Sequence, residues 1–124
     1  MLAAALLMAL PLASAQQARA SRTEVRYLGG FQPDACRYPP EARRQGISAC
    51  CLMDLDIGAD GRVLKSAGEC TDPVFLEPTR RCLTVQQFIP ATQNGAPIQA
   101  HHRMEYEWRA TGQRENLCKR LRTS

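Results

Sequence analysis

Six cysteines constrain the fold of this chain more than any other feature. They are Cys36, Cys50, Cys51, Cys70, Cys82 and Cys118. An even number of cysteines in a short exported chain is typical of a disulfide framework. Zinc ligation would need Cys-x-x-Cys pairs or Cys/His clusters at fixed spacing, and the only histidines are the neighbours His101 and His102. We therefore expect a disulfide-stabilised domain without a metal, and the connectivity stays open at this point.

The first fifteen residues are the reason for expecting export. MLAAALLMALPLASA is apolar except for Ser14, and its end has the small-x-small form of a signal-peptidase site. The stretch is shorter than the roughly 20 apolar residues of a membrane-spanning helix. No Lys or Arg precedes it, which counts against secretion, and extra apolar residues from a start further upstream would turn the leader into an anchor. We expect a signal peptide at 1–15 and no membrane span after its cleavage, with an inner-membrane anchor as the alternative.

Charge and residue types exclude two function classes. The net charge is +4, from 16 basic and 12 acidic residues that are mixed along the chain, which does not indicate nucleic-acid binding. An enzyme would need a nucleophile with a base, or paired carboxylates in a pocket. Asp54 and Asp56 share one strand face, where a solvated sheet surface is the ordinary explanation. We expect no enzymatic activity and no cofactor.

Local patterns divide the chain into four parts. Residues 16–36 read as a flexible lead-in in which TEVRYL is a candidate accessory strand, and residues 110–124 read as a basic, solvated tail. The domain between them, 37–109, begins with Tyr38 and a helix over PEARRQ that Gly46 ends. Strict alternation from Cys51 to Ile57 then predicts a strand with one buried face.

The rest of the domain continues the pattern. Gly58-Ala59-Asp60-Gly61 predicts a hairpin turn, and Arg62 to about Gly68 a second strand. Pro78 is expected as the first residue of a second helix, PTRRCLTVQQ. ATQNGAP is expected as a loop, and 98–109 as a long third strand with one apolar and one charged face.

The order helix, strand, strand, helix, strand predicts an α+β fold. A right-handed crossover sets the third strand parallel to the second. The first strand then fits between them, so the sheet is three-stranded and antiparallel in the order 2-1-3, with both short helices on one face (αββαβ). The third strand becomes an edge with unpaired backbone groups, which any partner strand can use.

Adjacent Cys50 and Cys51 point to opposite sheet faces and are not expected to bridge each other. With Asp60 at the hairpin centre, Cys50 lies roughly opposite Cys70, while Cys82 looks inward from the second helix. Cys70 can therefore reach either one. We favour Cys70–Cys82, which leaves the other four cysteines to secure the lead-in and the tail.

Fifteen residues form an ordered series along 38–98: Tyr38, Pro39, Ala42, Gly46, Ile47, Asp60, Gly61, Val63, Leu76, Phe88, Pro90, Ala91, Gly95, Pro97 and Ile98. With this series the chain resembles the C-terminal domain of the TonB energy-transducer family over about 37–108. The chain departs from the family at Ala49, Glu77 and Gln86, which stand where Gly, Asp and Trp are usual. It also carries six cysteines, and shows neither the spanning helix nor the long Pro-rich reach of the transducers.

The resemblance implies a free-standing periplasmic module that binds protein. In that family the last strand pairs with the N-terminal box of an outer-membrane receptor, by β-augmentation. Carried to this sequence, the binding edge comprises Ile98, Gln99, Ala100, His101, His102, Arg103, Met104, Glu105 and Tyr106. The partner is then a receptor peptide or another periplasmic protein, and a homodimer through the open edge is a further alternative. Two other functions stay open: a disulfide-stabilised accessory protein without receptor binding, and an anchored transducer if the true start lies upstream.

Overall fold

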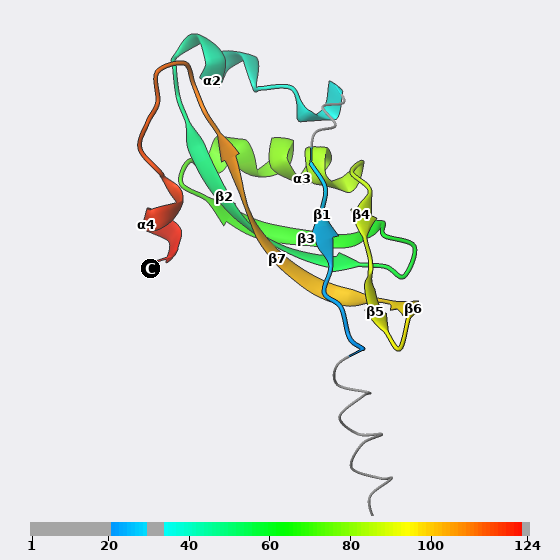
Figure 1. Cartoon of the computed structure of the whole chain (residues 1–124). Helices are drawn as coiled ribbons and strands as arrows, with labels where there is room; N and C mark the ends of the chain where they lie inside the picture. Colours follow the sequence, from blue (N-terminus) through cyan, green and yellow to red (C-terminus); the bar gives the residue numbers. More distant parts are fainter. Residues whose placement is uncertain (1–20, 30–33, 123–124) are drawn as a thin grey trace, which may run out of the picture.

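A three-stranded antiparallel sheet forms the centre of the fold (Figure 1). Its strands are β2 (Ala49–Ile57), β3 (Val63–Cys70) and β7 (Ala100–Trp108), in the order β3-β2-β7. They correspond to the first, second and third strands expected from the sequence. The computed structural model describes residues 21–29 and 34–122, so the leader expected at 1–15 lies outside the described residues.

The buried face of the sheet follows the alternation in β2. Cys51, Met53, Leu55 and Ile57 are fully buried, as the sequence predicts, and they pack against Phe75 and Leu83. We call this side the inner face. The outer face carries the intervening residues of β2, among them Cys50, Leu52 and Asp54.

A bulge in the β2–β3 hairpin sets its register. Ile57 lies opposite Val63, but Asp56 lies opposite Lys65, so Leu64 is an extra residue on β3. A residue inserted into one strand of a hairpin moves every later pair by one position. As a result Cys51, and not Cys50, lies opposite Cys70.

Two helices contribute to the core on the inner face. α2 (Pro40–Arg44) buries Ala42, and Gly46, with a φ of +65°, follows its end as predicted. α3 (Leu76–Thr84) follows a short 3-10 turn, η2 (Pro73–Phe75), and begins two residues before Pro78. The prediction that Pro78 opens this helix is therefore wrong. Pro78 still lies in the first turn, where backbone N–H groups have no partner within the helix.

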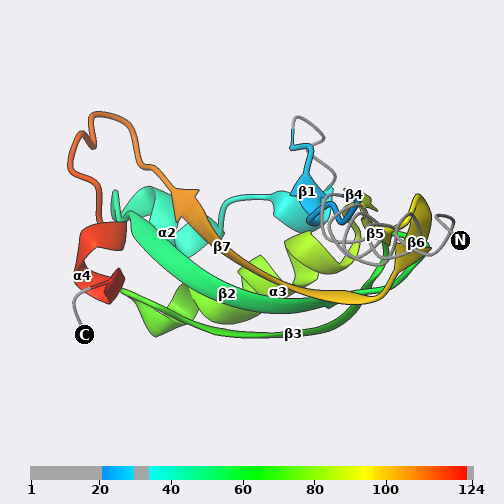
Figure 2. The same cartoon turned by 60° about the horizontal axis from the view of Figure 1, so that its bottom comes forward.

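One side of α3 is buried, and it includes Cys82, which was expected to look inward. Thr79, Cys82 and Leu83 are fully buried and Gln86, just beyond the helix, is 5% exposed. Figure 2 shows α3 running lengthwise along one face of the sheet, beside β2 and β3. This side of the helix closes the core.

Four short strands and one further α-helix add to these elements, so the simple αββαβ order is incomplete. β1 (Arg26–Tyr27) pairs with β4 (Phe88–Ile89), and β5 (Ala91–Gln93) pairs with β6 (Ala96–Ile98). The segment expected as a loop, ATQNGAP, is therefore a hairpin. Its turn residues Asn94 and Gly95 both have positive φ, which is the geometry of a tight two-residue turn. The fifth element, α4 (Cys118–Arg122), lies in the tail.

Three disulfides use all six cysteines. Cys51–Cys70 joins β2 to β3, Cys36–Cys82 joins η1 (Asp34–Cys36) to α3, and Cys50–Cys118 joins β2 to α4. The favoured pair Cys70–Cys82 is wrong, because the bulge places Cys70 beside Cys51. The tail is not solvated throughout, since Cys118 is fully buried and its disulfide fixes α4 to the outer face, while Lys119 and Arg120 are exposed.

Candidate strand-binding edge

β7 is an outer strand of the sheet. It pairs with β2 along its whole length, and no other strand of residues 21–29 and 34–122 pairs with it. Figure 1 shows β7 crossing the front of the molecule, with α2 near its end and β1 near its beginning. Its second long side is therefore the candidate site.

The hydrogen bonds of Cys50 show which backbone groups of β7 are free. The backbone N–H of Cys50 donates to Thr71 Oγ1 (3.1 Å), and the N–H of Thr71 donates to the carbonyl oxygen of Cys50 (2.9 Å). The backbone of Cys50 thus faces β3. Backbone direction alternates along a strand, so Cys51 and every second residue from it face β7.

The same alternation shows which way the backbone groups of β7 point. Cys51 lies opposite Tyr106 and Met53 opposite Met104, so the even-numbered residues of β7 turn their backbone groups toward β2. The odd-numbered residues turn theirs to the open side. These are His101, Arg103, Glu105 and Glu107. They offer an edge of four outward-facing residues to a partner strand.

An aromatic cluster supports the end of this edge on the inner face. The rings of Tyr106 and Trp108 lie 5.2 Å apart, and Tyr38 meets Trp108 edge-on at 5.5 Å. The indole N–H of Trp108 donates to Thr79 Oγ1 at 2.8 Å. Trp108 is 4% exposed, so this end of β7 is held firmly.

A hollow of about 410 Å³ opens beside this aromatic cluster, between β7 and the segment leading into α2. It is lined by Asp34, Cys36, Arg37, Tyr38, Arg43, Tyr106, Glu107, Trp108 and Arg109. We call it the inner hollow. It can receive side chains that a strand bound to β7 turns to the inner face.

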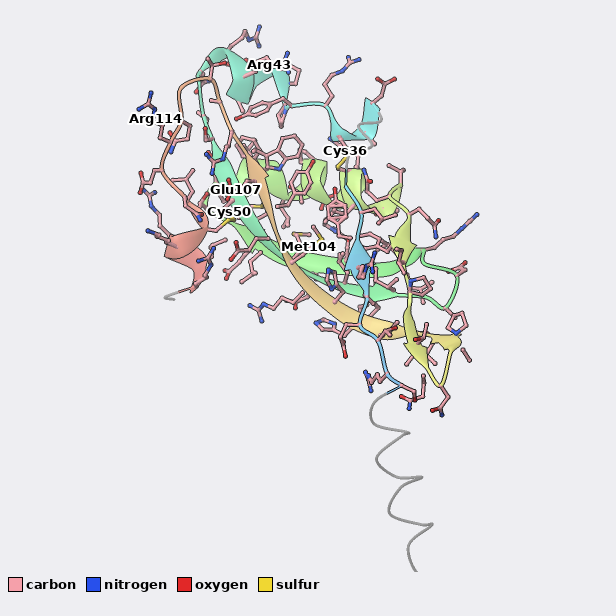
Figure 3. The ribbon with its side chains drawn as sticks, in the orientation of Figure 1. Cys36, Arg43, Cys50, Met104, Glu107 and Arg114 are labelled. Carbon is pink, nitrogen blue, oxygen red and sulfur yellow. A yellow bond between two sulfur atoms is a disulfide. The ribbon has the colours of Figure 1, made fainter. Side chains whose placement is uncertain are left out.

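The inner hollow is basic. Arg37 pairs with Asp34 at 3.4 Å, and Arg109 pairs with Glu107 at 2.6 Å. Arg43 lies 5.8 Å from the centre of the Tyr38 ring and makes no ion pair with a described residue. Figure 3 shows Arg43 projecting from α2 and Glu107 on β7. Among the described residues, Arg43 therefore adds a positive charge without an ion-pair partner at this end.

The outer face of β7 is charged, and most of its charges are paired. The ring nitrogens of His101 lie 3.0 Å from Asp54 and 3.4 Å from Asp56. Glu105 accepts two hydrogen bonds from Arg122 of α4, one of them 2.8 Å long. This bonding lowers the pKa of Glu105 below its usual value. Arg103 makes no ion pair with a described residue.

His102 lies on the inner face, half-buried against Phe88, with the two ring centres 6.0 Å apart. Burial lowers its pKa, the neighbouring charge of His101 lowers it further, and Glu24 acts in the opposite direction. His102 is therefore neutral at pH 7 and packs as an aromatic residue.

The residues expected to form the edge divide into two groups. Those from Ala100 to Tyr106 lie in β7, whereas Ile98 belongs to β6, paired with Ala91, and Gln99 lies between the strands. The continuous strand expected from residue 98 onward therefore begins at Ala100. The third strand expected over 98–109 already contains Glu107, whereas Arg43 was not expected at the site, because only the fold brings it beside β7.

One group of potential metal ligands does not form a metal site. Cys50, Glu105 and Cys118 lie close enough together to share an ion. The two sulfur atoms are bonded to each other, so neither is the thiolate that a metal requires. The group is a disulfide beside a carboxylate.

The described part of the chain contains no helix with the length and apolar character needed to cross a bilayer. No curated protein matches the sequence. The sequence profile of one family, described as Gram-negative bacterial TonB protein C-terminal, matches residues 34–110. That range contains the whole central sheet, α2 and α3, and covers more than half of the chain. The chain therefore belongs to the family of TonB C-terminal domains.

Proposed function

We propose that this protein is a periplasmic binding module that takes up a strand of another protein along the open side of β7. The expected partner is the N-terminal box of an outer-membrane receptor. The observation that carries the proposal is the row of outward-facing backbone groups at His101, Arg103, Glu105 and Glu107. Membership of the TonB family supports the location and the kind of partner.

The edge suits β-augmentation because both ingredients of that mode are present. Main-chain hydrogen bonds supply affinity, and alternate side chains of the added strand supply selectivity. An added strand would turn every second side chain toward the inner face, where the inner hollow lies beside Tyr106. The disulfides and the aromatic cluster hold the edge in place before binding, which reduces the entropy lost on association.

A peptide titration tests the proposal. Peptides that copy receptor boxes of the same genome are added to the isotope-labelled, disulfide-intact protein, and backbone amide signals are followed. The expected result is a saturable shift of the amides at 101–107. If no box peptide moves these amides, the proposal is wrong.

A proline substitution makes the test specific for main-chain pairing. The N–H of Arg103 points to the open side, so Arg103→Pro removes one donor offered to the partner and leaves the ladder to β2 intact. Arg103→Ala, which keeps the N–H, is the matched control. We expect Arg103→Pro to bind a box peptide about tenfold more weakly than Arg103→Ala, because one hydrogen bond is lost and the partner carbonyl is left unpaired. Equal binding by the two variants would contradict strand addition.

A further inference from the structure

A second hollow lies on the outer side of β7, between this strand and α4. It has a volume of about 600 Å³ and is lined by Leu52, Arg103, Met104, Glu105, Leu121 and Arg122. We call it the outer hollow. Four of these residues come from the sheet, and two come from α4.

α4 lies beyond the residues that match the family, 34–110. Two links fix it against the outer face of the sheet: the Cys50–Cys118 disulfide and the paired hydrogen bonds from Arg122 to Glu105. Figure 1 shows α4 beside β2, on the opposite side from α3, and Figure 3 shows Cys50 beside α4. The helix therefore forms a fixed wall next to the binding edge.

The outer hollow is continuous with the edge itself. Arg103 and Glu105 line it, and these two residues also turn their backbone groups to the open side. A strand that pairs with them turns alternate side chains to the outer face. One of those side chains then lies over the outer hollow.

The lining determines which side chains fit. Leu52 and Leu121 supply apolar side chains, which favour an aliphatic side chain in the hollow, whereas the side chain of Met104, opposite Met53, lies on the inner face. Two guanidinium groups face one carboxylate around it, and Arg103 has no ion-pair partner among the described residues. Side chains two residues apart lie on the same face of a strand, so a carboxylate two positions from the aliphatic residue can reach Arg103.

We propose that α4 turns the edge of β7 into a selective site: the partner strand carries an aliphatic side chain on its outer face, seated in the outer hollow, and a carboxylate two residues away, paired with Arg103. This inference rests on the proposed strand binding and adds the chemistry of the partner. The discriminating residue is Leu121, which lies beyond the residues that match the family.

Defined peptides test it. The parent is a blocked eight-residue peptide of alternating threonine and valine in which two outer-face positions, two residues apart, are aspartate and leucine. One companion replaces the leucine by alanine, and another replaces the aspartate by lysine. Each is titrated into the disulfide-intact protein while the amides of 101–107 are followed. We expect the parent to bind about five- to tenfold more tightly than either companion.

A substitution in α4 then tests whether this helix causes the preference for leucine over alanine. Leu121→Ala should weaken binding of the leucine peptide several-fold and leave the alanine peptide unchanged. Leu64→Ala is the matched control, since Leu64 is an exposed leucine on the far strand β3. The leucine and alanine peptides should keep their ratio on this control.

The outcomes separate this inference from the proposed function. If the peptides shift the amides of 101–107 but leucine and alanine bind equally, or Leu121→Ala affects both alike, strand binding stands and selection by α4 is overturned. If no peptide of any kind shifts these amides, both fall together. If the amides shift with protein concentration alone, a second copy of this chain occupies the edge, and the inference is overturned.

Discussion

Thr79 shows how one buried hydroxyl supports the candidate edge of β7. The hydroxyl accepts a hydrogen bond from the indole N–H of Trp108 and donates one to the carbonyl oxygen of Phe75 at 2.7 Å. Both polar partners are buried, and the bond fixes the ring that forms the wall of the inner hollow. The hydrogen bond between Thr79 and Trp108 therefore belongs both to the core and to the wall of the inner hollow.

Replacing Thr79 by valine keeps the shape and removes the hydroxyl. We expect Thr79→Val to lower the free energy of unfolding by about 1–3 kcal/mol, because the indole N–H is left buried without an acceptor. Thr84→Val is the matched control, since Thr84 lies exposed on the same helix and donates only to the carbonyl of Arg80. Urea unfolding followed by the fluorescence of Trp108 measures both. Equal losses would show that the hydroxyl of Thr79 has no special role.

The lowered pKa of His102 predicts a pH dependence of stability. The unfolded chain binds a proton near the ordinary value of 6.5, while the folded chain binds it only at lower pH. Stability from this group is therefore complete above pH 6.5 and is lost as the pH falls below it. We expect the melting temperature to decrease less between pH 7.5 and pH 5 in His102→Phe, which keeps the ring contact with Phe88. A steeper decrease in that variant would refute this assignment.

At the scale of elements, sequence patterns succeed where one local signal dominates. The alternation in β2 and the Pro/Gly boundaries of α2 each depend on nearby residues, and both were predictable. The hairpin of β5 and β6 carries an Asn-Gly turn signal, but its flanking runs are too short to alternate. Leu64 gives no local sign that it is a bulge, and that one residue decided which cysteine meets Cys70.

α4 is held against the outer face of the sheet by the Cys50–Cys118 disulfide. Replacing Cys50 and Cys118 together by alanine opens a cross-link that spans 68 residues of sequence. We expect the free energy of unfolding to fall by about 2–4 kcal/mol, mainly because the unfolded chain becomes less restricted. The fluorescence of folded Trp108 should not change, since it belongs to the inner face.

Arg122→Ala is the control for this prediction, because it removes the ion pair to Glu105 and keeps the disulfide. Exposed ion pairs contribute little, so its urea midpoint should match that of the unchanged protein. A double alanine variant that loses the native tryptophan signal would instead show that the inner core depends on α4.

At the scale of the whole molecule, the three disulfides join parts that the sequence keeps far apart. Cys36–Cys82 fixes the segment before α2 to α3, and Cys50–Cys118 fixes the tail to the sheet, so the two walls beside β7 are both cross-linked. The edge itself was predictable from strand order and alternation. The two hollows were not, because Arg43 and Leu121 reach β7 only through contacts between distant segments.

This arrangement makes a prediction about the mature protein as it is isolated. If the leader at 1–15 is removed and the molecule is exported, the intact mass should correspond to a chain beginning at Gln16, with two hydrogens missing for each of three disulfides. No thiol should react with a labelling reagent before reduction. Tandem mass spectrometry that cleaves between the adjacent residues Cys50 and Cys51 should then assign their partners as Cys118 and Cys70. A Cys50–Cys70 link would mean that β3 lacks the bulge at Leu64, and α4 would then be tied to the inner face. A mass that retains the leader would instead favour a chain held at the membrane, where the same edge would act close to an anchor.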